Sequence, residues 1–273
     1  MNFGTDIAGY RGNEVRETLL FVRWLQLGAF CPLMENGGNG AHAPWLCVPF
    51  HALLVPLPTL ACDNCCRYDN ATSSTITDIY RTFASIHTAL GPYLLAAGSA
   101  AFESNSSAMT FTDDTTYLLG ADILVAPLLS NASNSRAVQF PGKGTWTNWF
   151  TNETHAGGST AVVSAAIDQF PVFKKSGSII ATLGAFAHYV SPFDRSLDPS
   201  GPPPIVFVIT QPASAGMACV RSNRTGFVAE YSHDGGRSSR LSARARGTQS
   251  VAFVMVISFP FDTTHHQHSP LAA

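Results

Sequence analysis

The spacing of apolar residues indicates two helices in the first hundred residues of the chain. Between positions 14 and 30, apolar side chains recur every three or four residues, as on one face of an α-helix. A second helix is predicted from Thr77, which we expect to be its N-cap, and Gly91-Pro92 is expected to kink it. A short strand at 5–7 precedes the first helix. This order of strand, helix, loop and helix suits the last turns of an α/β barrel.

The pattern changes to short apolar runs after about residue 108. These runs are separated by Gly, Pro and Asn turns, which is typical of an antiparallel β-sandwich. We predict a sandwich domain over residues 108–190, with strands at 117–129, 137–140, 145–150, 161–167 and 177–180.

The chain therefore divides into four predicted regions, and the fold class is α/β plus all-β. Residues 1–107 are assigned to the C-terminal part of a (β/α)8 barrel, with an unusual insert at 46–75 that a retained intron would explain. After the sandwich, residues 191–261 are predicted to form a partial second β domain. Residues 262–273 are expected to be a disordered tail.

Composition argues against several classes of function. The chain of 273 residues is 45% hydrophobic and 12% charged, with a net charge of −2 and no basic patch, so no nucleic-acid partner is expected. Its longest apolar stretch, 46–60, is short and broken by prolines, so no membrane span is expected. Cys62, Cys65 and Cys66 have half the spacing of a zinc site, but no second Cys or His pair follows. Neither a metal nor a cofactor is predicted.

Five Asn-x-Ser/Thr sequons lie along the chain, and they favour a glycoprotein on a secretory or extracellular route. Chance matches in a chain rich in Ser, Thr and Asn are the alternative. The five asparagines are Asn70, Asn105, Asn131, Asn152 and Asn223.

Several segments resemble, in order and spacing, the motifs of glycoside hydrolase family 31, the α-glucosidase-like enzymes. Gly4–Tyr10 is similar to a Gly-x-Asp-Ile-x-Gly-Phe/Tyr motif near the end of the family's barrel, and Glu35–Trp45 resembles a loop of one branch. The resemblance covers residues 4–182 and implies the C-terminal remnant of a TIM barrel followed by an antiparallel β-sandwich. The other similar segments are Phe21–Met34, His87–Leu94, Leu119–Pro127, Phe140–Gly144, Phe170–Phe173 and Gly177–Ile180.

The resemblance also implies a chemistry and a set of site residues. Family members hydrolyse O-glycosyl bonds by a retaining mechanism with two Asp residues, which implies an α-glucoside or oligosaccharide substrate. Both Asp precede the Gly-x-Asp-Ile-x-Gly motif, so we expect no catalytic residue in this chain. Substrate binding is expected at Asp6, Tyr10 and His42. The respective alternatives are an ordinary turn Asp, a core aromatic residue and a structural or solvated His. The alternative for His42 arises because Ala41 and Ala43 replace the branch's Glu and Arg around the His.

Two functional hypotheses follow. The first is a glycoside hydrolase of the α-glucosidase type, here a fragment without its catalytic carboxylates and inactive by itself. The second is a non-catalytic carbohydrate-binding or structural β-sandwich protein. Linkage preference, compartment and oligomeric state are not determined by these residues.

Overall fold

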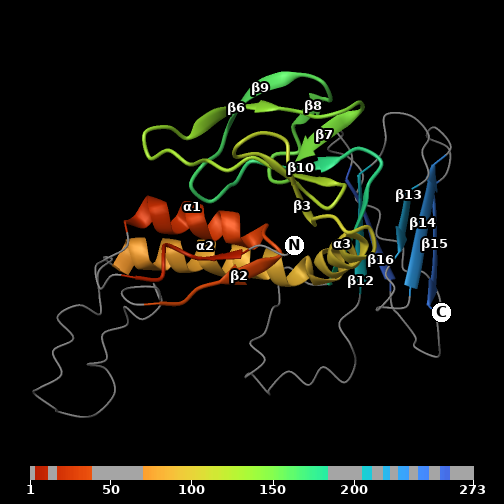
Figure 1. Cartoon of the computed structure of the whole chain (residues 1–273), viewed down its shortest axis with the longest axis horizontal. Coiled ribbons are helices and arrows are strands. Elements are labelled where there is room, and N and C mark those ends of the chain that lie inside the picture. The colour runs from red at the N-terminus through yellow and green to blue at the C-terminus, as the bar shows by residue number, and fades with distance from the viewer. Residues whose placement is uncertain are drawn as a thin grey trace, which may run out of the picture.

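The computed structural model describes residues 4–11, 17–38 and 70–183, together with the backbone of five strands between 205 and 258. Helices α1 and α2 lie side by side beneath the β6–β10 region (Figure 1). His42 and most of the predicted 46–75 insert lie outside the described residues. Among the described helices, none is long and apolar enough to cross a membrane.

A β–α–β unit opens the described chain. Strands β1 (Gly4–Asp6) and β2 (Leu33–Glu35) pair in parallel and are joined through helix α1 (Thr18–Ala29). The Glu17 carboxylate accepts hydrogen bonds from the backbone N–H groups of Leu19 and Leu20, at 3.0 and 2.7 Å. These donors have no partner within the helix, so the carboxylate caps its start. Parallel strands joined by a helix are the repeating unit of α/β barrels, as the sequence predicted.

Two further helices follow, α2 (Asn70–Ala89) and α3 (Gly91–Glu103). The predicted N-cap at Thr77 is wrong, because α2 already begins at Asn70. The kink predicted at Gly91-Pro92 is a break between two helices in the structure: Leu90 separates α2 from α3, and the proline occupies the first turn of α3, where its missing N–H costs no hydrogen bond. His87 lies on α2, and its Nδ1 is 3.1 Å from the carbonyl oxygen of Ala29 at the end of α1.

The sandwich is mostly antiparallel, as predicted. Its larger sheet has the strand order β3-β4-β5-β10-β7-β8, and β6 pairs with β9 in a separate ladder. The predicted strand at 117–129 is two strands, because the chain turns at Gly120. The sequence did not predict β3, β8 and β10. The bounds are β3 (Met109–Phe111), β4 (Tyr117–Leu119), β5 (Ile123–Val125), β6 (Ser135–Gln139), β7 (Thr145–Asn148), β8 (Thr154–Ala156), β9 (Thr160–Ser164), β10 (Val172–Lys175) and β11 (Ile179–Leu183).

The C-terminal strands form two small sheets. Strand β11 pairs antiparallel with β12 (Ile205–Thr210), which pairs in parallel with β16 (Phe253–Ser258). The other sheet is a meander of β13 (Ala218–Arg221), β14 (Phe227–His233) and β15 (Ser239–Ala245). Backbone pairing therefore continues across position 190, where the sequence suggested a boundary between two β units.

One hydrophobic core joins the barrel helices to the sandwich. Phe30, at the end of α1, stacks on Phe170 with ring centroids 6.0 Å apart and meets Trp149 edge-on at 5.9 Å. Phe83 of α2 contacts Phe150 at an interplanar angle of 42°, with ring centroids 5.7 Å apart. Burying each such ring stabilises the fold by about 1.5–3 kcal/mol. The helices and the sandwich are therefore expected to unfold together.

Candidate functional site

The β1–β2 pair places two carboxylates side by side. The parallel register aligns Gly4 with Leu33, Thr5 with Met34 and Asp6 with Glu35. Met34 packs against the main core, whereas Leu33 and Glu35 are exposed. Side chains alternate between the faces of a strand and aligned residues share a face, so half-buried Asp6 lies with Glu35 on the face turned away from the core. Both residues end their strands.

A tight turn after β1 fixes the position of Tyr10. The N–H of Gly9 donates to the Asp6 carbonyl at 2.9 Å, and Ala8 and Gly9 have φ angles of 62° and 85°. Buried Ile7 extends the strand pairing by donating to the Glu35 carbonyl at 2.9 Å. The Tyr10 side chain is 60% exposed, so it is a surface ring and not a core aromatic residue.

The loop after β2 packs onto the same turn. A Cβ at Gly38, where φ is 105°, would overlap the main chain of Tyr10, so only glycine permits this close approach of the two backbones. Asn36 donates from Nδ2 to the Tyr80 hydroxyl at 3.2 Å. Burial raises the pKa of Tyr80, and this hydrogen bond opposes the shift. The loop is thereby anchored to α2 on one side and to the Tyr10 turn on the other.

We call the surface formed by Asp6, Tyr10 and Glu35 the rim. The chemistry available at this rim is hydrogen bonding to a polar ligand. Ionised carboxylates accept several hydrogen bonds, which suits a ligand rich in hydroxyl groups. An exposed tyrosine ring offers an apolar face beside them. Within the described residues, no group of three or more His, Cys, Asp or Glu side chains could hold a metal ion.

A polar network that the sequence did not reveal fastens α1 to the sandwich. Gln26 is fully buried, and its Nε2 donates to the carbonyls of Ile167 at 2.7 Å and Gln169 at 3.0 Å. The Arg23 guanidinium donates to the Gln26 Oε1 at 3.1 Å and to the carbonyl of Ala165 at 3.5 Å. Burial lowers the pKa of Arg23. Arg23 therefore connects α1 to the sandwich and has a structural role.

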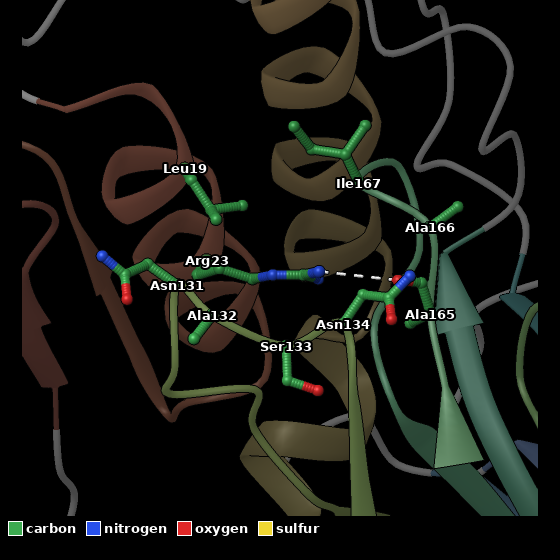
Figure 2. A pocket seen from close by; sticks show the side chains of 9 residues that line it. All are labelled: Leu19, Arg23, Asn131, Ala132, Ser133, Asn134, Ala165, Ala166 and Ile167. Carbon is green, nitrogen blue, oxygen red and sulfur yellow. Dashed lines mark hydrogen bonds between the residues drawn. The ribbon is translucent and has the colours of Figure 1, made fainter.

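An open cavity of about 440 Å³ lies beside this network (Figure 2). Helix α1 forms one wall, the segment 131–134 forms a second and the segment 165–167 forms a third. In Figure 2 the Arg23 side chain extends from α1 across the cavity towards Ala165. This cavity is separate in sequence from the rim at Asp6 and Tyr10.

Two domain models of one protein family match this chain, and together they cover residues 1–180. Residues 1–97 match the glycosyl hydrolases family 31 TIM-barrel domain. Residues 94–180 match the glycosyl hydrolase family 31 C-terminal domain. The rim at Asp6 falls in the first match, and the sandwich falls in the second.

Similar proteins agree with these matches. The chain is 28% identical to alpha-glucosidase 2 of Bacillus thermoamyloliquefaciens over 65% of its own length and 21% of the relative's. It is 29% identical to human neutral alpha-glucosidase C over 65% of its length and 18% of the relative's. Its fold matches that of a Flavobacterium johnsoniae GH31 dextranase variant complexed with isomaltotriose, with a TM-score of 0.68 and 19% identity over 95% of this chain and 32% of that one. The chain thus spans about a fifth of the length of these curated relatives.

Proposed function

The chain belongs to glycosyl hydrolase family 31. From this membership we propose that it supplies one rim of the sugar pocket in an α-glucosidase-type hydrolase and also the domain that supports this rim. The observation that best supports the proposal is the alignment of Asp6 with Glu35 at the carboxyl ends of neighbouring parallel strands. Active sites of (β/α)8 barrels are built at that end of the strands. The proposed substrate is an α-glucoside or an oligosaccharide.

Each residue of the rim has a proposed role. Asp6 accepts hydrogen bonds from sugar hydroxyls, and the exposed ring of Tyr10 lies against a sugar face. His42, outside the described residues, is proposed as a third contact. We add Glu35, whose exposed carboxylate shares a face with Asp6.

The proposal also holds that the catalytic carboxylates are supplied from outside this chain. Retaining hydrolysis needs a nucleophile and an acid/base with carboxyl groups about 5–5.5 Å apart. Neighbouring strands are separated by about 4.8 Å, so Asp6 and Glu35 could satisfy this distance. An experiment on the chain therefore has to separate a binding pair from a catalytic pair.

A non-catalytic carbohydrate-binding or structural β-sandwich protein is the second candidate. The observation that favours it is a separate core within the sandwich, built around Phe140, Trp146 and Phe173. A protein of this kind would bind sugar, if at all, without help from Asp6.

The test combines turnover with binding on the full chain. Hydrolysis of p-nitrophenyl α-glucoside is followed by absorbance, and binding of maltose and isomaltotriose is followed by saturation-transfer NMR. We expect no hydrolysis, and we expect sugar binding that Asp6→Ala abolishes. The matched control is Asp114→Ala, which removes an exposed aspartate from a sandwich turn and should leave binding unchanged.

Two results would contradict the proposal. Hydrolysis that Glu35→Gln abolishes would mean that the catalytic pair lies in this chain. Sugar binding that survives Asp6→Ala, or an absence of sugar binding, would favour the second candidate.

A further inference from the structure

The cavity beside helix α1 has walls of mixed chemistry. Leu19 and Ile167, which is 42% exposed, present apolar groups, while Ser133, Asn134 and Arg23 present polar ones. Its volume of about 440 Å³ is within the range of about 300–1,000 Å³ that is usual for small-molecule pockets. Sugars have both apolar ring faces and hydroxyl groups, so such walls suit a carbohydrate.

One wall of this cavity is itself a sequon. Asn131-Ala132-Ser133 lies in the connection between β5 and β6, outside any helix or strand, and residues 131–134 are all exposed. The hydroxyl of Ser133 donates to the Ser135 carbonyl at 3.0 Å, and the Ala132 N–H donates to the Ser130 Oγ at 3.1 Å. An exposed sequon in a loop is the usual acceptor for N-glycosylation.

The direction of the Asn131 side chain leaves it open to modification. In Figure 2 this side chain lies at the edge of the cavity, on the side of Leu19, and points away from the Arg23 guanidinium. A sugar on its amide would start at the mouth of the cavity and would have Leu19 beside it.

We propose that Asn131 is an N-glycosylation acceptor and that the first sugars of its glycan cover the mouth of this cavity. In the transfer step, the Nδ2 atom of Asn131 forms a bond to the anomeric carbon of a lipid-diphosphate-linked oligosaccharide. The bond from that carbon to the diphosphate oxygen breaks, the lipid diphosphate leaves, and one amide proton is released to the transferring enzyme. The first N-acetylglucosamine then lies at the edge of the cavity on the side of Leu19.

Another described sequon offers a matched control. Asn105 follows α3 in an exposed turn with a φ of 50°, and it does not line this cavity. Aspartate tolerates a positive φ as asparagine does. Asn105→Asp and Asn131→Asp therefore each remove one acceptor with the smallest change to the backbone.

The test uses the full chain, secreted from yeast behind a secretion leader. Peptide N-glycosidase in heavy-oxygen water converts an occupied asparagine into a labelled aspartate, and we expect this label at Asn131. This readout does not require a folded variant. An unlabelled Asn131 would overturn the proposal.

The second measurement tests coverage of the cavity. Backbone hydrogen exchange at 131–134 and 165–167 should become about threefold faster or more when the Asn131 glycan is removed by the enzyme or by Asn131→Asp. Asn105→Asp should leave exchange in both segments unchanged. Equal exchange rates with and without the Asn131 glycan would refute its placement over the cavity.

Discussion

Replacing Gly120 by alanine tests how helix α3 is joined to the sandwich. Gly120 has a φ of 61° in the turn between β4 and β5, and a Cβ there would lie 2.5 Å from the Tyr93 hydroxyl oxygen. That hydroxyl donates to the Leu119 carbonyl at 2.8 Å and accepts from the Asp122 N–H at 3.1 Å. Tyr93 is only 5% exposed, so its ring cannot move away without disturbing both bonds.

The expected loss has two parts. The left-handed backbone costs an alanine about 1–2 kcal/mol, and the lower entropy of the unfolded alanine chain returns about 0.4–1 kcal/mol. The overlap with the Tyr93 hydroxyl adds about 1–3 kcal/mol, as for other overpacked sites. Gly120→Ala should therefore destabilise the protein by about 1–4.5 kcal/mol in total, a large share of the 5–15 kcal/mol typical of a domain.

A double-mutant cycle separates the two parts. Gly142→Ala is the control, because φ is 72° there and no atom lies within 4 Å of the added Cβ, so the control loses only the backbone part. Tyr93→Phe alone should cost about 1–3 kcal/mol, because the carbonyl of buried Leu119 and the N–H of half-buried Asp122 both lose this hydrogen bond. It also removes the overlapping oxygen, so the double variant should lose at least about 1 kcal/mol less than the sum of the singles. Unfolding of the full chain is followed by circular dichroism. Equal losses for Gly120→Ala and Gly142→Ala, or strict additivity with Tyr93→Phe, would refute the reasoning.

Two further predictions concern the contacts of α1. Burial lowers the pKa of His87, and its hydrogen bond to the Ala29 carbonyl opposes the shift, so the unfolded chain binds a proton more readily. Stability should therefore fall as pH drops below about 6.5. His87→Asn should reduce the change in melting temperature between pH 7.5 and about 5. An unchanged dependence of the melting temperature on pH would contradict this assignment. Gln26→Met should lower the free energy of unfolding by about 1–3 kcal/mol, because the Ile167 carbonyl loses this donor and the Arg23 guanidinium loses the Gln26 Oε1 acceptor. Urea titration measures the loss, and Leu20→Met, at an exposed position of the same helix, should change it little.

The helices were predictable because their apolar spacing reflects local geometry. Strand β10 was missed for a physical reason: Lys174 is only 5% exposed yet charged, so the segment does not show the pattern of a buried strand. Its ammonium lies 5.5 Å from the centre of the Trp149 ring, and burial lowers the pKa of Lys174. A lysine can bury its aliphatic stem while its ammonium lies against an aromatic ring. A hydropathy pattern counts the residue as polar and therefore does not predict its burial. Strand β8 has three residues, two of them exposed, which is too short for an alternating pattern.

The candidate rim was predictable only in part. Asp6 and Tyr10 were selected from a motif within seven residues, and the turn between them is local. The alignment of Asp6 with Glu35 depends on the register of two strands that a helix separates, and spacing along the chain does not determine register. The exposure of Tyr10 also depends on which face of the turn meets the core. Both facts required the fold.

The shared core gives the sandwich a role at the rim. Helix α1 connects the two strands that end in Asp6 and Glu35, so a shift of the helix moves both carboxylates. The sandwich fixes α1 at one end through Phe30 on Phe170, and along its length through Gln26 and Arg23 on the 165–169 loop. Site geometry held by packed rings and buried hydrogen bonds is preserved only while those partners stay in place. The C-terminal domain is therefore expected to position the proposed sugar-binding rim. If Asp6 binds sugar as proposed, a change at Gln26 should weaken that binding without contacting the ligand.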